Sequence, residues 1–367
     1  MKISLLQEKL IKPLSFVGKN ISPKSQLPIT QHIYLFAKEG QLTLATTNLE
    51  TTIYTKVAVK VEKEGGICVP FKLFSEYIQS LPQDKITLTV EKQNLIVQCN
   101  GYEAAIPGVA KEEFPQITKK IKESITLEGD AFFEAIRLVA FSSATDESRP
   151  LLTGVKIKNT KDGCLFVATD GYRLSLKRTQ IALPEKFDTV LPGRALLEVV
   201  HVWQEEKEKK NATMHVMEDG QLGFIVGETE IYTRSIEGEY PNFERIIPKS
   251  TTTTVTLKKE PFLRGMKSAA IFARDSANIV KIHIEDGVLI ATANTPQIGE
   301  NKVEIAVEKE GEDGDVAFNS RFLLEFLNNS TDEDLVFEMT GSLNPGAFKT
   351  PKDDSYLHII MPVRVQA

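Results

Sequence analysis

The chain has 367 residues, 41% of them apolar and 26% charged, and a formal net charge of −6. This length suits two or three domains, and the composition excludes a disordered or fibrous chain. No apolar run approaches the roughly 18–20 residues of a membrane span. Lys2, Glu8 and Lys9 interrupt the N-terminal stretch, which makes it a poor signal peptide. We therefore expect a cytoplasmic protein.

The first predicted element is a short strand that leads into a helix, and it occurs three times. The strands are predicted at 3–5, 125–127 and 255–257. Apolar residues at helical spacing follow the last two strands, namely Phe132, Phe133, Ile136, Val139 and Ala140 in the second copy and Phe262, Met266 and Ala270 in the third.

Two further elements recur on a similar period. An element that contains Ala-Thr recurs at 44–48, 167–171 and 290–294, so that Thr46, Thr169 and Thr292 are each 123 residues apart. A helix is predicted to begin within 68–74, 190–196 and 317–323, with an apolar stripe at positions i, i+3, i+4 and i+7. The stripe residues are Phe74, Tyr77, Ile78 and Leu81, then Leu196, Val199, Val200 and Trp203, then Leu323, Phe326 and Leu327. Three features on one period predict three copies of one unit.

Short alternating runs rich in Val, Ile and Thr separate the helices, for example at 85–90, 95–99 and 212–216. Such runs are typical of antiparallel strands. We therefore predict an α+β fold of three tandem domains, 1–122, 123–250 and 251–367, each of antiparallel β-sheets with two α-helices. The acidic run 308–315 lacks the ligand spacing and the twelfth-position Glu of an EF-hand, so we expect it to form a solvated turn.

Residues that often carry chemistry form no recognisable site. Cys68, Cys99 and Cys164 are far apart and odd in number, which favours reduced thiols in β-rich cores over a disulfide framework or a metal site. The histidines are scattered without ligand spacing, at His32, His201, His215, His283 and His358. The common nucleotide, hydrolase and metalloprotease motifs are missing from the sequence. We therefore expect no catalysis, no metal and no cofactor, and an enzyme such as a phosphodiesterase is the minor alternative.

Positive charge is concentrated in two segments, although the whole chain is acidic. Residues 1–24 and residues 258–274 each carry a net charge of +4, which leaves −14 for the remainder. A protein with basic segments on an acidic background can present one face to DNA and repel DNA elsewhere. Solvated helix faces are the alternative interpretation of both segments.

Five stretches give the chain a specific resemblance. They are Arg149–Val155 (RPLLTGV), Ala168–Leu174 (ATDGYRL), Leu191–Arg194 (LPGR), Glu237–Pro248 (EGEYPNFERIIP) and Met361–Arg364 (MPVR). In this order, on a triple repeat, they make the chain similar over its whole length to the bacterial sliding clamp, the β subunit of replicative DNA polymerase III. The resemblance implies a non-catalytic head-to-tail homodimer, a ring of six similar domains whose helices line the hole around duplex DNA.

Cations that face DNA are the first set of residues implied by this resemblance. A sliding protein needs attraction to phosphates without readout of bases, and flexible Lys and Arg side chains suit that task. The candidates are Lys12, Lys24, Lys72, Arg137, Arg149, Arg194, Arg264 and Lys267. Family motif positions favour Lys24, Lys72, Arg149 and Arg194. A solvated surface cation is the alternative for each residue.

A hydrophobic cleft between the second and third domains is the next implied site. In the family it takes a short peptide from the polymerase III catalytic subunit, the clamp loader and other partners. The matching residues are Leu152, Thr169, Gly171, Tyr172, Arg173, Leu174, Pro241, Arg245, Ile246, Leu343, Pro345, Ile359, Met361, Pro362 and Val363. Met adapts to varied partners, and arginine at the rim can hold polar groups of a peptide. The alternatives are an ordinary terminal strand at 361–363 and a plain turn at Asp170–Gly171, where Gly supplies a positive φ.

The contact between the two copies of the ring is the last implied site. Motif positions suggest Ala104 and Ile106 from the first domain and Ile271 and Phe272 from the third. Packing in the core of a single chain is the competing interpretation. A three-domain scaffold that docks peptides without encircling DNA is the rival function, and no membrane partner is expected.

Overall fold

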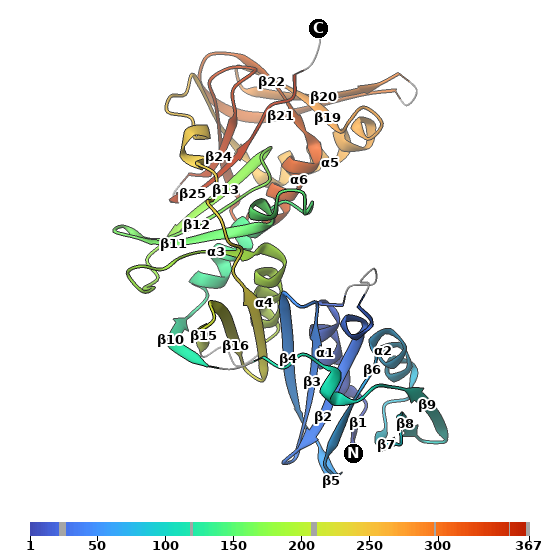
Figure 1. Cartoon of the computed structure of the whole chain (residues 1–367). Coiled ribbons are helices and arrows are strands. Elements are labelled where there is room, and N and C mark those ends of the chain that lie inside the picture. Colours follow the sequence, from blue (N-terminus) through green and yellow to red (C-terminus); the bar gives the residue numbers. More distant parts are fainter. Residues whose placement is uncertain (22–26, 118–119, 207–210, 297–298, 352, 365–367) are drawn as a thin grey trace. The chain divides into compact units, whose positions relative to one another are not determined.

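The computed structural model describes residues 1–367 except 22–26, 118–119, 207–210, 297–298, 352 and 365–367. The chain divides into two compact units (Figure 1). Unit 1 is Met1–Asp130 with Ala195–Ser235, and unit 2 is Ala131–Arg194 with Ile236–Ala367. Helix α4 crosses the border between them. No helix in the described ranges is both long enough and apolar enough to cross a membrane.

Unit 1 consists of two antiparallel sheets covered by helices. In chain order its elements are β1 (Lys2–Leu6), α1 (Glu8–Gly18), η1 (Pro28–Gln31), β2 (His32–Lys38), β3 (Gln41–Thr47), β4 (Thr51–Ala58), β5 (Lys60–Lys63), β6 (Gly65–Pro70), α2 (Phe71–Ser80), β7 (Lys85–Glu91), β8 (Asn94–Cys99), β9 (Tyr102–Pro107), η2 (Lys111–Glu113), β10 (Ile121–Glu128), α4 (Gly193–Glu205), β15 (Asn211–Met217), β16 (Gln221–Val226) and β17 (Thr229–Arg234). The sheets run in the orders β5-β1-β7-β8-β9 and β10-β15-β16-β17-β4-β3-β2-β6.

Unit 2 is organised around one long sheet. Its elements are α3 (Ala131–Ala140), η3 (Pro150–Thr153), β11 (Gly154–Thr160), β12 (Gly163–Thr169), β13 (Arg173–Thr179), β14 (Asp188–Pro192), η4 (Phe243–Ile246), β18 (Thr253–Lys258), α5 (Lys259–Ala273), β19 (Ile279–Glu285), β20 (Val288–Thr295), β21 (Gly299–Gly311), β22 (Gly314–Asn319), α6 (Ser320–Asn329), β23 (Asp334–Met339), β24 (Gly346–Thr350) and β25 (Asp353–Ile360). The strand order is β14-β11-β12-β13-β25-β24-β23-β18-β21-β20-β19-β22.

The predicted helices and strands are confirmed, and the apolar stripes explain why they form. Phe74 and Ile78, one turn apart in α2, are fully buried, and so are Leu323 and Leu327 in α6. Phe262 of α5 shares one core with the α6 stripe and with β23. Each predicted domain contributes two helices, α1 and α2, α3 and α4, and α5 and α6. The α+β class is therefore confirmed.

The period of the Ala-Thr element needs one correction. Thr47 pairs with Thr52 across β3 and β4, as Thr169 pairs with Leu174 across β12 and β13. The structural equivalent of Thr169 is therefore Thr47, 122 residues earlier, and the prediction that it is Thr46 was wrong. The Thr-Thr doublet hides this one-residue difference, which only the register of the paired strands resolves.

The acidic run 308–315 was predicted to form a solvated turn, and the structure differs from this prediction. Its first part continues strand β21 to Gly311, where Val307 pairs with Leu257 and Gly311 with Thr253 of β18. Apolar and acidic residues alternate along β21, and the acidic side chains occupy the outward-facing positions. The strand can therefore continue into the acidic run. Only Glu312 and Asp313 lie between β21 and β22.

The cysteines agree with the expectation of core thiols. Cys68, Cys99 and Cys164 lie in β6, β8 and β12, and all are buried and free of disulfides. Burial raises the pKa of Cys68 and of Cys164 to about 12, since the thiolate would lose its hydration. These thiols are therefore poor nucleophiles.

Candidate functional site

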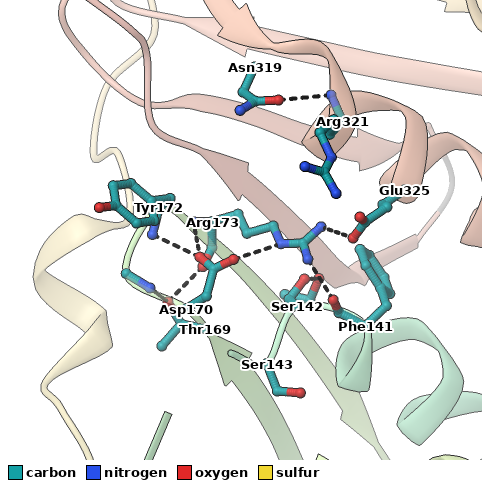
Figure 2. Close-up of polar contacts among 12 residues, drawn as sticks. Phe141, Ser142, Ser143, Thr169, Asp170, Tyr172, Arg173, Asn319, Arg321 and Glu325 are labelled. Atoms are coloured by element: carbon teal, nitrogen blue, oxygen red, sulfur yellow. Dashed lines mark hydrogen bonds and ion pairs between the residues drawn. The ribbon is translucent and has the colours of Figure 1, made fainter. Parts of the chain in front are cut away.

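The turn between β12 and β13 is the centre of the candidate cleft (Figure 2). Thr169 Oγ1 accepts a hydrogen bond from Gly171 N at 3.1 Å and donates one to Arg173 O at 2.6 Å. Asp170 Oδ1 accepts from the backbone N–H groups of Tyr172 and Arg173 at 2.8 and 3.0 Å. These bonds form an Asx turn that fixes the direction in which Tyr172 projects.

Glycine is favoured within this turn for two reasons. Gly171 has φ +91°, which disfavours any residue with a Cβ. A Cβ there would also lie 3.0 Å from Nη1 of Arg149, whose Nη2 donates to Asp170 O at 3.1 Å. The expected positive φ is therefore confirmed, and Arg149 lies against the cleft turn.

Arg173 is buried, with 6% of its surface exposed. Its Nε donates to Asp170 Oδ2 at 3.1 Å, and its Nη2 donates to Phe141 O at 2.8 Å. Its Nη1 forms a 2.5 Å ion pair with Glu325 of α6. Because these internal partners occupy the guanidinium, Arg173 positions the turn and is not free to hold a peptide at the rim. Arg245 has an exposed side chain and is the better candidate for that role.

The floor of the candidate cleft is an apolar cluster across the β13–β25 pair. Leu174 pairs with Ile359, and both side chains are fully buried. Ile246 of η4 packs against the same cluster, together with Tyr240 and Phe243. Three predicted cleft residues from distant parts of the sequence are thus brought together.

Met361, Pro362 and Val363 follow the end of β25 as a half-buried tail. Met361 N donates to Tyr172 O, and Val363 N donates to Ala317 O, both at 2.8 Å. The tail therefore joins the cleft turn to β22. The alternative of an ordinary terminal strand was wrong for these residues, because their hydrogen bonds go to two different segments.

The outer part of the candidate cleft presents exposed apolar groups. Tyr172 is 60% exposed and Leu343 is 62% exposed. The Tyr172 ring stacks on Phe322 of α6 with a 6.3 Å centroid separation. The Arg173 guanidinium also lies over the Phe322 ring, with its Cζ 4.8 Å from the ring centroid. Sequence reasoning missed Phe322, although it follows the third helix start by two residues.

The remaining cleft candidates lie on loops and short helices. Leu152 is buried in η3, and its carbonyl accepts from Ala144 N at 2.8 Å. Pro241 is exposed just before η4, and Pro345 is half-buried just before β24.

A buried polar chain lies behind the cleft floor. Ser142 and Ser175 hydroxyls are 2.7 Å apart, and Ser175 Oγ is 2.7 Å from His358 Nδ1. The His358 ring stacks on Phe326 with a 4.7 Å centroid separation. Burial and the nearby Arg173 charge hold the pKa of His358 well below its usual 6.5. The imidazole is therefore neutral and bonded inside unit 2.

The structure separates the predicted DNA-facing cations into two groups. Lys12 Nζ donates to Glu205 O at the end of α4, and Arg137 Nη1 donates to Asn329 O at the end of α6, both at 2.6 Å. These side chains satisfy helix C-terminal carbonyls. With Arg149 at the cleft turn, three candidates have internal partners.

The second group is exposed on helices. Arg194 lies on α4, and Arg264 and Lys267 lie on α5. Lys72 lies on α2, with Glu76 4.0 Å away and 86% of its side chain exposed. Lys24 is outside the described residues.

The candidate seam residues differ in exposure. Ile271 is 58% exposed on α5, and Phe272 is half-buried beside it. Ala104 is half-buried on β9, the edge strand of its sheet. Ile106 is only 2% exposed, so the competing core interpretation holds for its side chain. Tyr102 on the same strand, which sequence reasoning did not single out, is 55% exposed.

Comparison with known proteins gives consistent matches along the chain. Models of the DNA polymerase III beta subunit match in succession, with its N-terminal domain over residues 1–118, its central domain over 126–242 and its C-terminal domain over 244–364. A beta sliding clamp of Bacillus subtilis is 26% identical over 99% of this chain and 100% of its own length. The crystal structure of a DNA polymerase III beta subunit from Thermotoga maritima matches with a TM-score of 0.89, 26% identity and full coverage of both chains.

Proposed function

The chain belongs to the DNA polymerase III beta subunit family, and from this premise we propose that it is a sliding clamp that makes DNA synthesis processive. Two copies close head to tail around duplex DNA, in the cytoplasm, and tether the replicative polymerase to it. The chain is a non-catalytic subunit. The succession of three domain models over residues 1–364 is the observation that carries this proposal.

The division into three domains, 1–122, 123–250 and 251–367, is part of this proposal. Neither border falls within a helix: the first lies near the start of β10 (Ile121–Glu128), inside that strand, and the second lies in the connection before Thr253 at the start of β18. Six such domains in a ring place α1 to α6 of both copies toward the hole. The exposed Lys72, Arg194, Arg264 and Lys267 then attract phosphates without reading bases.

Two open sheet edges support ring closure. Strand β9 ends the five-stranded sheet. In β21, residues 299–306 pair with β20 on one side, and no described strand pairs with their other side. An unpaired edge readily binds a strand of another chain. We place the seam where β9 of one copy meets β21 of the other, beside the exposed Ile271 and Tyr102.

The cleft docks short peptides of the polymerase III catalytic subunit, the clamp loader and other replication proteins. Three features support this role: an apolar floor at Leu174 and Ile359, exposed apolar groups at Tyr172 and Leu343, and a backbone positioned by Arg173. In the third copy of the repeat, β20 continues through Thr295, and Gln297 lies outside the described residues. We propose one cleft per chain.

Topological retention on DNA tests the ring. The chain, loaded onto a nicked circular plasmid by a bacterial clamp loader, should stay bound during gel filtration, and it should be lost once the plasmid is linearised. Equal retention on both forms would contradict encirclement. It would favour the rival scaffold that docks peptides without enclosing DNA. A solution mass equal to one chain would contradict the homodimer.

Peptide docking is tested separately with cleft residues that are exposed or half-buried, because Leu174 is fully buried and its replacement would disturb the fold. Leu343→Asp and Met361→Lys should weaken binding of the polymerase catalytic subunit at least tenfold, while retention on circular DNA stays normal. Leu49→Asp is the matched control, since Leu49 is 44% exposed on another turn. Polymerase binding that is equally strong in all three variants would remove the cleft assignment.

A further inference from the structure

A groove between α5 and α6 is a concave feature of unit 2. It encloses about 510 Å³. Its polar lining consists of Lys267, Arg274, Asn278, Ser320 and Arg321. Ile271 and Leu324 provide an apolar wall. None of the residues that line it is acidic, so the groove has a positive potential.

The charges of this groove are not neutralised within the described chain. Among the described residues, Lys267, Arg274 and Arg321 form no ion pair with a carboxylate. Glu325 stands one helical turn after Arg321, where an i, i+4 ion pair would be expected. Its carboxylate is instead held by Arg173 at 2.5 Å (Figure 2). The Arg321 guanidinium therefore remains available to an external anion.

Ser320 adds an unsatisfied donor to the groove. The residue is fully buried, and its Oγ has no hydrogen-bond partner among the described atoms. Its backbone N donates to Asn278 O at 2.7 Å, and Asn278 has a left-handed φ of 59°. A buried hydroxyl without a partner is costly. An acceptor oxygen in the groove would remove that cost.

The internal repeat gives independent support for Arg321. Lys72, Arg194 and Arg321 are each the second residue of a helix, α2, α4 and α6 respectively. A cation in the first turn opposes the helix dipole, which favours anions there. The repetition of this unfavourable choice in three copies is explained if an anion binds beside each position.

The groove also continues the exposed face of α5. Arg264, Lys267, Ile271 and Arg274 are spaced by three, four and three residues, so they form one stripe, and all four are exposed. The stripe begins with two proposed DNA-facing cations and ends in the groove. Ile271 is also a proposed seam residue, so the groove borders the contact between copies.

We propose that this groove is a discrete site for one phosphate group, and that in the loaded ring it holds a phosphate of the enclosed duplex. Arg274, Arg321 and Lys267 supply the charge, and the Ser320 hydroxyl donates a hydrogen bond to a phosphate oxygen. The choice of DNA as the source of the phosphate rests on the proposed function. The groove would then fix a preferred position of the duplex near the seam.

The first test is the salt dependence of binding to a short fluorescent duplex. Arg321→Gln should weaken binding several-fold at low salt and reduce the slope of log K against log [salt] by about 0.9 for each groove occupied. Ser320→Ala should weaken binding with an unchanged slope, because the hydroxyl is neutral. Arg178→Gln, an exposed arginine on β13, is the control and should leave both quantities unchanged. A response of Arg321→Gln equal to that of the control would overturn the proposal.

The second test separates one shared phosphate from a diffuse positive lining. Arg274→Gln with Arg321→Gln should weaken binding by less than the product of the two single effects, because both cations bind the same group. The effects of Lys72→Gln and Arg321→Gln on binding should multiply in the double variant, because these residues lie on helices of different units. Effects that multiply in both pairs would contradict a discrete site.

The third test needs no DNA and distinguishes the two proposals. Inorganic phosphate added to the free protein should shift the methyl NMR signals of Ile271 and Leu324 in a saturable way, and chloride at equal ionic strength should not. Arg321→Gln should abolish the shift. A saturable shift without any effect of the variants on DNA binding would identify a site for free phosphate and overturn the DNA source. Absence of the shift in a protein that still encircles DNA would overturn the groove alone.

Discussion

The turn after β3 and the turn after β12 have the same hydrogen-bond scheme but lead to different surfaces. In the first, Thr47 Oγ1 accepts from Leu49 N at 3.0 Å, and Asn48 Oδ1 accepts from Glu50 N and Thr51 N at 3.1 and 2.7 Å. In the second, Thr169 and Asp170 make the same three contacts with residues 171–173. The backbone of the repeat is thus preserved to the level of single hydrogen bonds.

The difference lies in the strands that follow each turn. After the first turn, β4 pairs with β17 through buried threonines, with hydroxyl contacts between Thr51 and Thr233 and between Thr55 and Thr229. After the second turn, β13 pairs with β25 through Leu174 and Ile359, and Tyr172 remains exposed. The same scaffold therefore forms a closed polar ladder in one place and a candidate cleft in the other.

Among the substitutions that test this comparison, loss of Arg173 is expected to have the largest effect on stability. Arg173→Ala leaves Asp170 Oδ2 and the Phe141 carbonyl without the donors that the guanidinium supplies, and should destabilise unit 2 by about 3 kcal/mol. Hydrogen exchange of β13 and β25 should accelerate, together with a lower urea midpoint. Fluorescence of the single tryptophan, Trp203 in unit 1, should report an unchanged transition.

Arg178→Ala serves as the matched control for that experiment, because Arg178 is exposed on the same strand. Its effect should stay within about 0.5 kcal/mol, as for most surface substitutions. If Arg173→Ala were as mild as this control, the turn would not depend on its internal ion pair.

The buried His358 predicts a pH dependence of unit 2. Its folded pKa is depressed, so the unfolded state takes up the proton first as the pH falls below about 6.5. Stability should be fully present above that value and decline by at most about 1.4 kcal/mol per pH unit below it, or about 2 kcal/mol between pH 7 and pH 5. His358→Gln should remove this part of the decline, measured by hydrogen exchange of β25 at both pH values. An identical pH dependence in the variant would mean that His358 is not neutral in the folded chain.

Sequence reasoning identified the helices, several strands and the cleft turn, because apolar periodicity and Asp-Gly are local signals. It did not identify which cleft residues are buried. Leu174 and Arg173 are covered by β25 and α6, which come more than 140 residues later in the chain. Phe322 and the groove at Arg321 depend on the packing of helices in the same way. Burial of a strand is set by its distant neighbours, and a local pattern does not contain them.

Substitution of the two residues with positive φ, Gly171 and Leu49, tests whether the two turns have the same backbone strain. Gly171→Ala should destabilise unit 2 by about 1–2 kcal/mol, because a Cβ is disfavoured at φ +91° and would press on Arg149. Leu49→Gly should be neutral or slightly stabilising, since Leu49 already has φ +77° and is 44% exposed. Urea unfolding measures both changes. Equal signs for the two substitutions would show that the turns do not share the same backbone strain.

The threonine ladder provides the smallest expected effect and the clearest test of its chemistry. Thr55 and Thr229 are both 3% exposed, and their hydroxyls are 3.0 Å apart. Thr55→Val alone should cost about 1 kcal/mol, because it leaves the Thr229 hydroxyl buried without a partner. Replacing both residues by Val should recover most of that loss, since no buried polar group then remains. The Trp203 transition in urea reports unit 1 directly. A double variant that loses the sum of two single effects would mean that each hydroxyl has its own role, and that β4 and β17 are joined by more than mutual satisfaction of two buried groups.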